Sequence, residues 1–403
     1  MSEPKVNYAS QTVFSVIFAV CFVHLLNDTV QAVIPSIYPI LKSSLHLSYT
    51  QIGLIGFALS GTASILQPLI GLYTDRKPLP YLLPIGVFFT LAGIVSVAYA
   101  NHFLMVMLAV VLIGIGSAIF HPESSRVAYL AAGTRKGLAQ SIFQFGGNIG
   151  QALAPLMTIL VFIRLGQRGA IWFSFVAILA IFVQFFVARW YARFLQHVKM
   201  DRQKAPKVQK ANPLARNATA FAIFILMLLL FSKNVYQAAI SNYYSFYLMD
   251  HFHVTLSTAQ IVLFVFLISN VVGLLIGGAL ADRFGRRNII WFSILGTAPF
   301  SIALPYANFA VSIALLVIVG LILSSAFSII VVYAHELLPG KVGLVSGIFF
   351  GISFGLGGIG TAFLGNLADS TGIPFIMQIT SYLPLLGLLT VFLPSDKKLH
   401  PST

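Results

Sequence analysis

Residues 71–77 read G-L-Y-T-D-R-K, and residues 278–287 read G-A-L-A-D-R-F-G-R-R. Each stretch closes a long apolar segment with a small residue, an aspartate and a cluster of cations. The two aspartates, Asp75 and Asp282, lie about 207 positions apart, which is roughly half of the 403-residue chain. The duplication therefore indicates two similar halves, each built from apolar segments.

The composition is that of a membrane protein. The chain is 58% hydrophobic and 8% charged, with a mean hydropathy of +0.92, whereas a soluble domain carries about 25% charged residues. Apolar runs of about 20 residues recur, and each can cross a hydrocarbon core of about 30 Å. Because backbone polar groups in lipid must be satisfied internally, these runs are predicted to be α-helices.

We predict an all-α membrane protein with twelve transmembrane helices. The first span is too long for a cleavable signal peptide and lacks a small-residue cleavage site. The predicted spans cover residues 12–41, 49–74, 80–100, 103–130, 135–163, 169–195, 218–249, 256–281, 288–306, 309–337, 342–369 and 373–394.

The distribution of cations predicts the orientation. If the N-terminus is inside, most of the 24 Lys and Arg residues fall in cytoplasmic segments, and the outside loops hold only Lys42, Arg164 and Arg168. This asymmetry places both termini in the cytoplasm. It also explains the net charge of +14 without a nucleic-acid partner. The single cysteine, Cys21, excludes an intrachain disulfide and a Cys-based metal site.

The chain is predicted to divide at a polar, basic stretch, residues 196–217, which contains Pro206 and Pro213. This cytoplasmic linker would join an N-terminal six-helix bundle, residues 1–195, to a C-terminal one, residues 218–403. Parallel repeats of this kind are typical of secondary transporters that bind substrate between their halves. Three further pairs repeat at similar offsets: L-S-x-x-Q-I at 47–52 and 256–261, Glu123 and Glu336, and G-L-x-x-x-I-F at 137–143 and 343–349.

These motifs resemble those of a known family. The D-R-x-G-R-R loop is similar to the loop motif of the major facilitator superfamily. The strings H-L-L-N-D at 24–28, F-H-P-E-S-S-R-V-A at 120–128 and G-L-A-Q-S-I-F-Q at 137–144 resemble the bacterial fosmidomycin-resistance exporters. The resemblance implies two pseudo-symmetric six-helix bundles, and a proton-driven drug efflux protein of the bacterial inner membrane.

The duplicated aspartates are predicted to form a cytoplasmic gate. A helix N-terminus carries about half a positive charge, which favours a nearby carboxylate. Asp75 is expected to meet the start of the span at 342–369, and Asp282 the start of the span at 135–163, in one state of the transporter. The residues predicted to support this gate are Arg76, Arg283, Arg286, Arg287 and Glu336.

Charged side chains within the spans predict the proton pathway, because such groups usually face the interior of a bundle. Asp28 lies near mid-depth and, since burial disfavours the charged form of a carboxyl group, it is predicted to exchange protons. His24, one turn away, would share or tune that proton. The alternative is that a fixed cation neutralises Asp28. Glu123 and Arg126, spaced i, i+3, are either a relay to Asp28 or a static pair that supports the gate.

Lys233 lies at nearly the same depth as Asp28 in the corresponding helix of the second half. It would either pair with Asp28 in the empty protein or bind an anionic substrate group such as a phosphonate. The further predicted substrate contacts are Tyr236, Tyr243, Tyr244, Gln31, Asn27, Gln144 and Asn148.

Three absent motifs narrow the function. The chain has no G-x-x-x-x-G-K-[ST] nucleotide loop, no H-E-x-x-H metal motif and no G-x-S-x-G nucleophile turn. We therefore predict no enzymatic activity, no cofactor and no metal site. The prediction is a monomeric, proton-coupled exporter of a small anionic antimicrobial. The alternative is a transporter of an endogenous anionic metabolite with incidental drug resistance.

Overall fold

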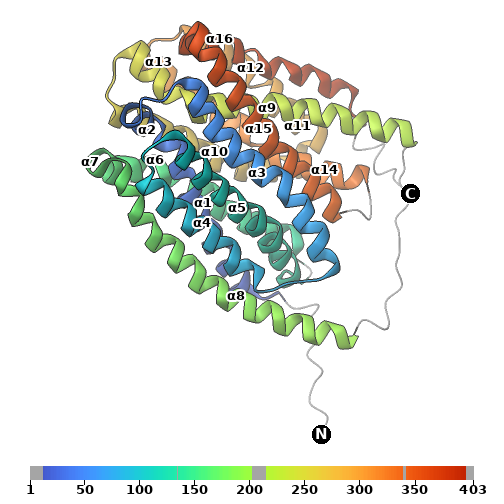
Figure 1. Ribbon diagram of the computed structural model, residues 1–403. Coiled ribbons are helices and arrows are strands. Elements are labelled where there is room, and N and C mark those ends of the chain that lie inside the picture. The colour runs from blue at the N-terminus through green and yellow to red at the C-terminus, as the bar shows by residue number, and fades with distance from the viewer. Residues whose placement is uncertain (1–11, 134, 202–214, 339–341, 396–403) are drawn as a thin grey trace.

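The computed structural model describes residues 12–133, 135–201, 215–338 and 342–395, and all regular structure in these residues is helical. The long helices run through a single bundle, and α8 and α9 reach the same end of it (Figure 1). We call this the linker end, because α8 stops there at Asp201 and α9 begins there at Arg216. The opposite end is called the far end.

The N-terminal half consists of the helices up to Asp201. Its elements are α1 (Phe14–Ser36), α2 (Tyr38–Ser44), α3 (Tyr49–Arg76), α4 (Leu82–Tyr99), α5 (Phe103–Ala131), α6 (Lys136–Met157), the π-helix η1 (Thr158–Phe162), α7 (Ile163–Leu165), the 3-10 helix η2 (Gly166–Trp172) and α8 (Phe173–Asp201).

The C-terminal half repeats this plan from Arg216 onward. Its elements are α9 (Arg216–Phe252), α10 (Leu256–Phe284), α11 (Arg286–Leu295), α12 (Ala298–Ala303), the 3-10 helix η3 (Leu304–Tyr306), α13 (Phe309–Ser324), α14 (Phe327–Leu337), α15 (Val342–Thr371), α16 (Ile373–Thr380) and the 3-10 helix η4 (Leu383–Phe392).

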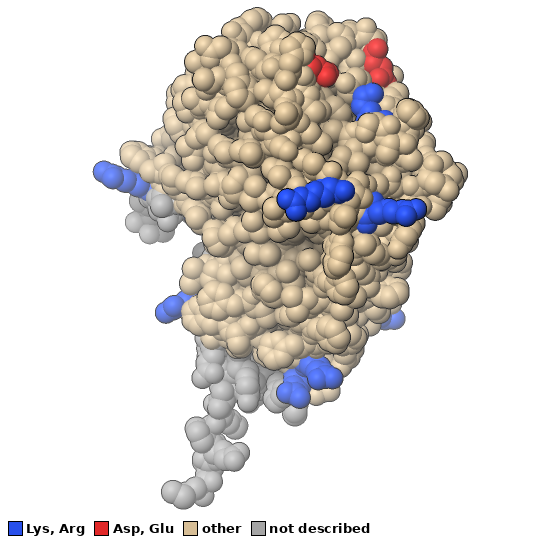
Figure 2. All heavy atoms as spheres, turned by 90° about the vertical axis from the view of Figure 1, so that its left-hand side faces the viewer, with Lys and Arg blue, Asp and Glu red and all other residues tan. Residues whose placement is uncertain are grey.

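These helices account for the twelve predicted spans. Eleven segments of the described residues are long and apolar enough to cross a membrane, and one of them, the 59-residue Leu138–Gln196, covers two predicted spans. Uncharged side chains cover most of the face shown in Figure 2. Large apolar side chains such as Phe182, Ile65 and Phe363 are more than half exposed, as expected of a surface that contacts lipid.

Several predicted spans are not single continuous α-helices, and proline is the usual cause. A proline removes one backbone donor and clashes with the preceding turn. The predicted first span is interrupted at Ile37, two residues before Pro39. The π-helix Thr158–Phe162 follows Pro155. Pro299 lies in the first turn of α12, and Pro384 in that of η4.

The hydrophobic core is shared at one end of the bundle and divided at the other. Toward the far end, one cluster of buried side chains joins both halves, for example Tyr38 and Ile52 with Tyr243 and Leu364. Toward the linker end, each half has a cluster of its own. Among the described residues, the two halves are therefore packed together at the far end and packed separately at the linker end.

Candidate functional site

A central cavity of about 260 Å³ lies between the two halves. Most of the residues that line it have polar side chains, although they lie within an apolar bundle. The N-terminal half contributes His24, Asp28, Ser60, His121, Gln144, Gly147, Asn148 and Gln151. The C-terminal half contributes Lys233, Asn234, Gln237, Ala238, Ser241, Asn242, Leu274, Ser324, Phe327, Ser353, Gly357 and Thr361.

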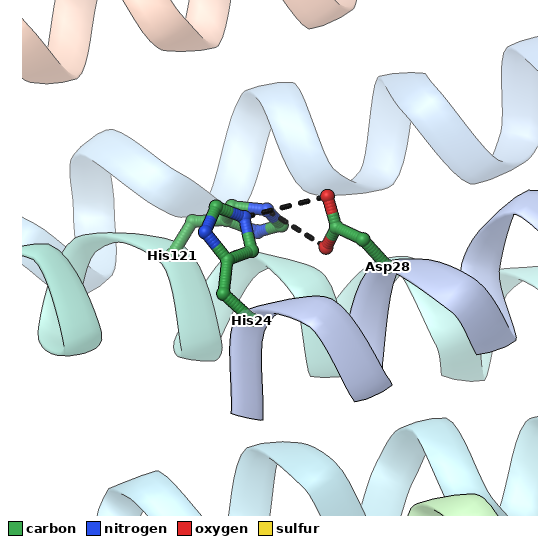
Figure 3. A group of neighbouring side chains, drawn as sticks. All are labelled: His24, Asp28 and His121. Carbon is green, nitrogen blue, oxygen red and sulfur yellow. Dashed lines mark ion pairs between the residues drawn. The ribbon is translucent and has the colours of Figure 1, made fainter. Parts of the chain in front are cut away.

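One wall of the cavity carries a cluster of two imidazoles around one carboxylate, shown in Figure 3. The Nε2 atom of His24 lies 3.3 Å from Oδ2 of Asp28, one turn away on α1. The Nε2 atom of His121, on α5, lies 3.4 Å from Oδ1 of the same carboxylate. Asp28 and His24 are only 3% exposed, so this charged group is held almost entirely inside the protein.

Backbone carbonyls set the orientation of both imidazoles. The Nδ1 atom of His24 lies 2.7 Å from the Phe143 carbonyl oxygen, and that of His121 lies 3.0 Å from the Ser117 carbonyl oxygen. Because a carbonyl oxygen can only accept, His24 Nδ1 carries a hydrogen. In a neutral His24 ring the Nε2 atom facing Asp28 is then a lone pair, and it becomes a donor only when the ring is protonated. His121 Nδ1 also lies 3.1 Å from Ser117 Oγ, a hydroxyl that can donate or accept.

Two amides complete the surroundings of Asp28. Asn27 Nδ2 donates to Oδ1 at 3.2 Å, and Gln151 Nε2, on α6, donates to Oδ2 at 3.0 Å. Behind them, Thr90 Oγ1 donates to Asn27 Oδ1 at 3.4 Å. Each carboxylate oxygen thus accepts one amide hydrogen bond and faces one imidazole.

The same cluster has the spacing of a metal-binding group. One ligand atom from each of His24, Asp28 and His121 lies within 4.8 Å of the others, and two imidazoles with a carboxylate are a set that transition metals accept. The sequence predicts no metal site. Each carboxylate oxygen accepts one amide hydrogen bond and keeps a second lone pair, so the group suits a proton shared with an imidazole as well as a metal ion.

Lys233 occupies the C-terminal wall of the cavity. Its side chain is 3% exposed, and Nζ lies 4.9 Å from the centre of the Phe327 ring, which offers it a cation–π contact. Within the described residues, Lys233 is at ion-pair distance from no carboxylate. The structure therefore brings Lys233 and Asp28 to one cavity without pairing them.

The other predicted substrate contacts separate into two groups. Gln144 and Asn148 line the cavity, whereas Asn27 and Gln31 do not. The three tyrosines do not line it either, and each is at most 1% exposed. Tyr243 donates to the Thr361 carbonyl oxygen at 2.6 Å, which is a packing contact. Five predicted substrate contacts therefore lie behind the cavity wall: Asn27, Gln31, Tyr236, Tyr243 and Tyr244.

The predicted Glu123–Arg126 pair forms, and it lies apart from the cavity lining. Arg126 Nη1 is 3.1 Å from Glu123 Oε1, and Thr74 Oγ1 donates to the same oxygen at 2.5 Å. Arg126 Nη2 also donates to the Gly71 carbonyl oxygen at 3.3 Å. These contacts tie α5 to α3 within the N-terminal half, so the arrangement favours the static interpretation over the relay.

The side chains of Asp75 and Asp282 lie outside the described part of the chain, so the predicted gate contacts remain predictions. Arg76 is exposed, and the guanidinium of exposed Arg283 lies 5.3 Å from the Phe284 ring. Arg286 forms an ion pair with Glu336 inside the C-terminal half. Arg287 donates to the carbonyl oxygens of Thr390 and Val391, at 3.3 and 2.8 Å, and so anchors α11 to η4.

Sequence reasoning missed two members of the cluster, His121 and Gln151. His121 precedes Pro122 in the string at 120–128 and has no predicted role of its own. Gln151 follows Gln144 and Asn148 at spacings of four and three, which places all three on one face of α6. That spacing was the available signal for Gln151. For His121 no local pattern exists, because its partner Asp28 is on another helix.

Comparisons with known proteins identify the family of this chain. A family model described as Major Facilitator Superfamily matches residues 20–246 and 224–403. The fosmidomycin resistance protein of Escherichia coli (strain K12) is 49% identical over 388 residues, covering 96% of this chain and 95% of that relative. The uncharacterized MFS-type transporter YfnC of Bacillus subtilis (strain 168) is 45% identical over 400 residues, covering 99% and 98% of the two chains.

Solved structures share the fold at low sequence identity. The xylose transporter XylE from E. coli, in a partially occluded inward-open conformation, has a TM-score of 0.75 and 15% identity, and covers 95% of this chain and 98% of its own. A D-xylose-proton symporter has a TM-score of 0.70 and 17% identity, with coverages of 96% and 99%. Together with relatives that match over nearly their full length, this shared fold means that the protein belongs to the major facilitator superfamily and, within it, to the fosmidomycin-resistance subfamily of transporters.

Proposed function

We propose that this transporter exports a small anionic antimicrobial, a phosphonate similar to fosmidomycin, across the bacterial inner membrane in exchange for protons. A role in drug resistance is supported by the 49% identical relative, which is named for fosmidomycin resistance. The observation that carries the proposal is a cavity with an acid–imidazole cluster on one wall and a buried lysine on the other. The linker end would face the cytoplasm, and the two halves would alternate about the cavity.

The cluster supports proton coupling because it offers two places for a proton. With Asp28 ionised and His24 neutral, the Nε2 lone pair of His24 faces a carboxylate oxygen at 3.3 Å, which is repulsive, and Nε2 of His121 lies 3.4 Å from the other oxygen. A proton on either Nε2 turns that contact into a charge-assisted hydrogen bond. Protons are therefore expected to bind between His24 and Asp28 and between His121 and Asp28.

Lys233 supports recognition of an anion. A buried ammonium group is costly unless it is paired, and within the described residues the nearby partner is the Phe327 ring. A phosphonate in the cavity would supply the missing negative charge. The amides of Gln144 and Asn148 on the opposite wall would bind other polar groups of the same substrate.

Exchange requires that substrate and protons exclude each other. Charge alone does not make the substrate and the protons exclude each other, because an anion near Asp28 favours protonation of the cluster. Competition arises when the substrate donates a hydrogen bond to an Asp28 oxygen or to an imidazole Nε2, because the protonated cluster has already filled those positions. We therefore expect the exported substrate to carry a hydrogen-bond donor as well as a negative charge.

The same electrostatics favour a second candidate. An endogenous anionic metabolite without such a donor would bind best when the cluster is protonated and Lys233 is charged. It would then move in the same direction as the protons, and drug resistance would be incidental. The direction of proton movement during transport separates the two candidates.

The proposal is tested in liposomes that contain a pH-sensitive dye and the wild type, Asp28→Asn or Lys233→Ala. Addition of fosmidomycin to the wild type should drive protons opposite to the drug. Asp28→Asn should abolish proton movement, and Lys233→Ala should weaken drug binding about tenfold or more, the effect of losing a hydrogen bond to a charged group. Arg164→Ala is the matched control, because Arg164 is an exposed cation outside the cavity lining.

Two results would contradict these assignments separately. Full coupled transport by Asp28→Asn would remove the cluster from the proton pathway. Normal drug binding by Lys233→Ala would remove the lysine from substrate recognition. Protons that move with the drug, and not against it, would support the second candidate.

A further inference from the structure

The duplicated L-S-x-x-Q-I motif has no part in the cavity, yet both copies lie at the far end and contact the opposite half. The first copy opens α3, and the backbone N–H groups of Tyr49 and Thr50 contact Asp369 near the end of α15. We propose that Asp369 is the latch of an outer gate, which holds the far end of the transporter closed and must release α3 before the cavity opens to that side.

Asp369 completes the cap of a helix in the other half. The first four N–H groups of an α-helix have no partner within the helix. In α3, the N–H of the N-cap residue Ser48 donates to Gln51 Oε1 at 3.0 Å, and the N–H of Gln51 donates to Ser48 Oγ at 3.1 Å. The two that remain, from Tyr49 and Thr50, donate to Asp369 at 2.8 and 2.7 Å.

A side chain adds a third bond to the same carboxylate. Thr50 Oγ1 donates to Asp369 Oδ2 at 2.5 Å. A carboxylate at a helix N-terminus also interacts favourably with the partial positive charge there. Asp369 is exposed, so water can replace it on both N–H groups when the halves part. The contact therefore has a specific geometry and can be broken at a small cost in free energy, as a gate requires.

Neighbouring contacts close the same end. Tyr49 Oη donates to Asp250 Oδ2 at 3.3 Å, at the end of α9. In the second copy of the motif, Gln260 Nε2 on α10 donates to the Ser36 carbonyl oxygen of α1 at 3.4 Å. The backbones of α3 and α15 also touch, because a Cβ atom at Gly365 would lie 2.4 Å from the Tyr49 carbonyl oxygen.

The division of the hydrophobic core agrees with this assignment. Both halves share one cluster toward the far end and have separate clusters toward the linker end. The Asp369 contact is therefore made in a state in which the far end is closed. The inference rests on transport by alternating access. It does not depend on which substrate moves or whether protons drive it.

The test measures access to the cavity from outside the cell, without substrate. A cysteine replaces Ser241, which lines the cavity, in a Cys21→Ser background, and a membrane-impermeant thiol reagent is added outside. Asp369→Asn should raise the labelling rate about tenfold, because a neutral amide replaces a hydrogen-bonded charge. Ser370→Ala is the matched control, since Ser370 Oγ bonds only the Leu367 carbonyl oxygen of its own helix. Equal labelling rates in the two variants would overturn the proposal.

A second experiment remains informative if Asp369→Asn does not fold. Thr50→Cys and Asp369→Cys are combined, and a short, cleavable bifunctional thiol reagent joins them. Transport should stop after linkage and return when a reductant cleaves the link. Full transport by the linked protein would show that the contact need not break, and would overturn the latch. Because the labelling assay needs no drug and no proton gradient, it can fail while the proposed function stands.

Discussion

His24 and His121 show how single hydrogen bonds decide the chemistry of a neighbouring group. Each ring uses Nδ1 on a backbone carbonyl, which leaves Nε2 to face Asp28. If Nδ1 faced solvent, the ring could change tautomer and donate to Asp28 without gaining a proton. With the tautomer of His24 held in this way, its Nε2 contact becomes favourable only when the cluster gains a proton.

We expect His121→Asn to lower the number of protons that move per substrate. The substitution removes one of the two Nε2 positions beside Asp28 and leaves His24 in place. Proton and substrate fluxes measured together in liposomes give this ratio directly. His102→Asn is the matched control, because His102 caps α5 by accepting from the Met105 N–H, a role that asparagine also performs. An unchanged ratio in His121→Asn would exclude His121 from the coupling.

At the scale of elements, the packing of α1 against α6 positions the cluster. The His24 ring stacks on Phe143 with the ring centres 4.1 Å apart. It occupies space that any side chain at Gly147 would need, since a Cβ atom there would lie 2.3 Å from His24 Nε2. The glycine therefore makes room for the imidazole, in addition to letting the helices approach closely.

Gly147→Ala is accordingly expected to displace the His24 ring and weaken proton coupling severalfold, while the protein still folds. Coupled transport and thermal unfolding in detergent measure the two effects. Gly61→Ala is the matched control, because a Cβ atom at Gly61 would meet its nearest neighbour, the Phe57 ring, at 3.5 Å, an ordinary van der Waals contact. Alanine should stabilise that helix by about 1 kcal/mol. Normal coupling in Gly147→Ala would show that the position of the ring is not critical.

At the scale of the whole molecule, the way the hydrophobic core is divided between the two halves suggests how the halves would move relative to each other. A shared core at the far end and separate cores at the linker end describe two halves whose apolar packing is continuous only toward one end, although α3 and α15 remain in contact as far as Ser64 and Gly351. Rocking about the central cavity would bring the linker ends together and part the far ends. The predicted contacts of Asp75 and Asp282 would then form as the Asp369 contact breaks.

The orientation of the molecule leads to a separate prediction. The concentration of Lys and Arg in the predicted inside segments predicts that the linker end faces the cytoplasm. Alkaline phosphatase fused after Asn101, between α4 and α5, should be active, because the enzyme folds only outside the cytoplasm. The same enzyme fused after Thr403 should be inactive. The reverse pattern would invert the topology and turn the proposed outer latch into an inner one.

Much of the fold and part of the site could be predicted from local patterns. The twelve spans follow from apolar runs long enough for lipid, and the two halves from motifs repeated along the chain. Asp28, His24, Lys233, Gln144 and Asn148 were predicted for the cavity and line it, because a polar residue within a span must face the interior. The tyrosines of α9 fit the same pattern and yet are packed in the core, since their apolar rings can be buried on any interior face.

The sequence by itself determined that the chain is a two-halved membrane bundle with an acid and a lysine at mid-depth. These properties depend on composition, segment length and periodicity, which are local. Only the tertiary structure decided that His121 and Gln151 join Asp28, that Lys233 faces it without pairing, and that Asp369 caps α3 across the two halves. Each of these contacts joins residues about 90 to 320 positions apart, and their distance in space is set by how helices pack, which no local pattern records.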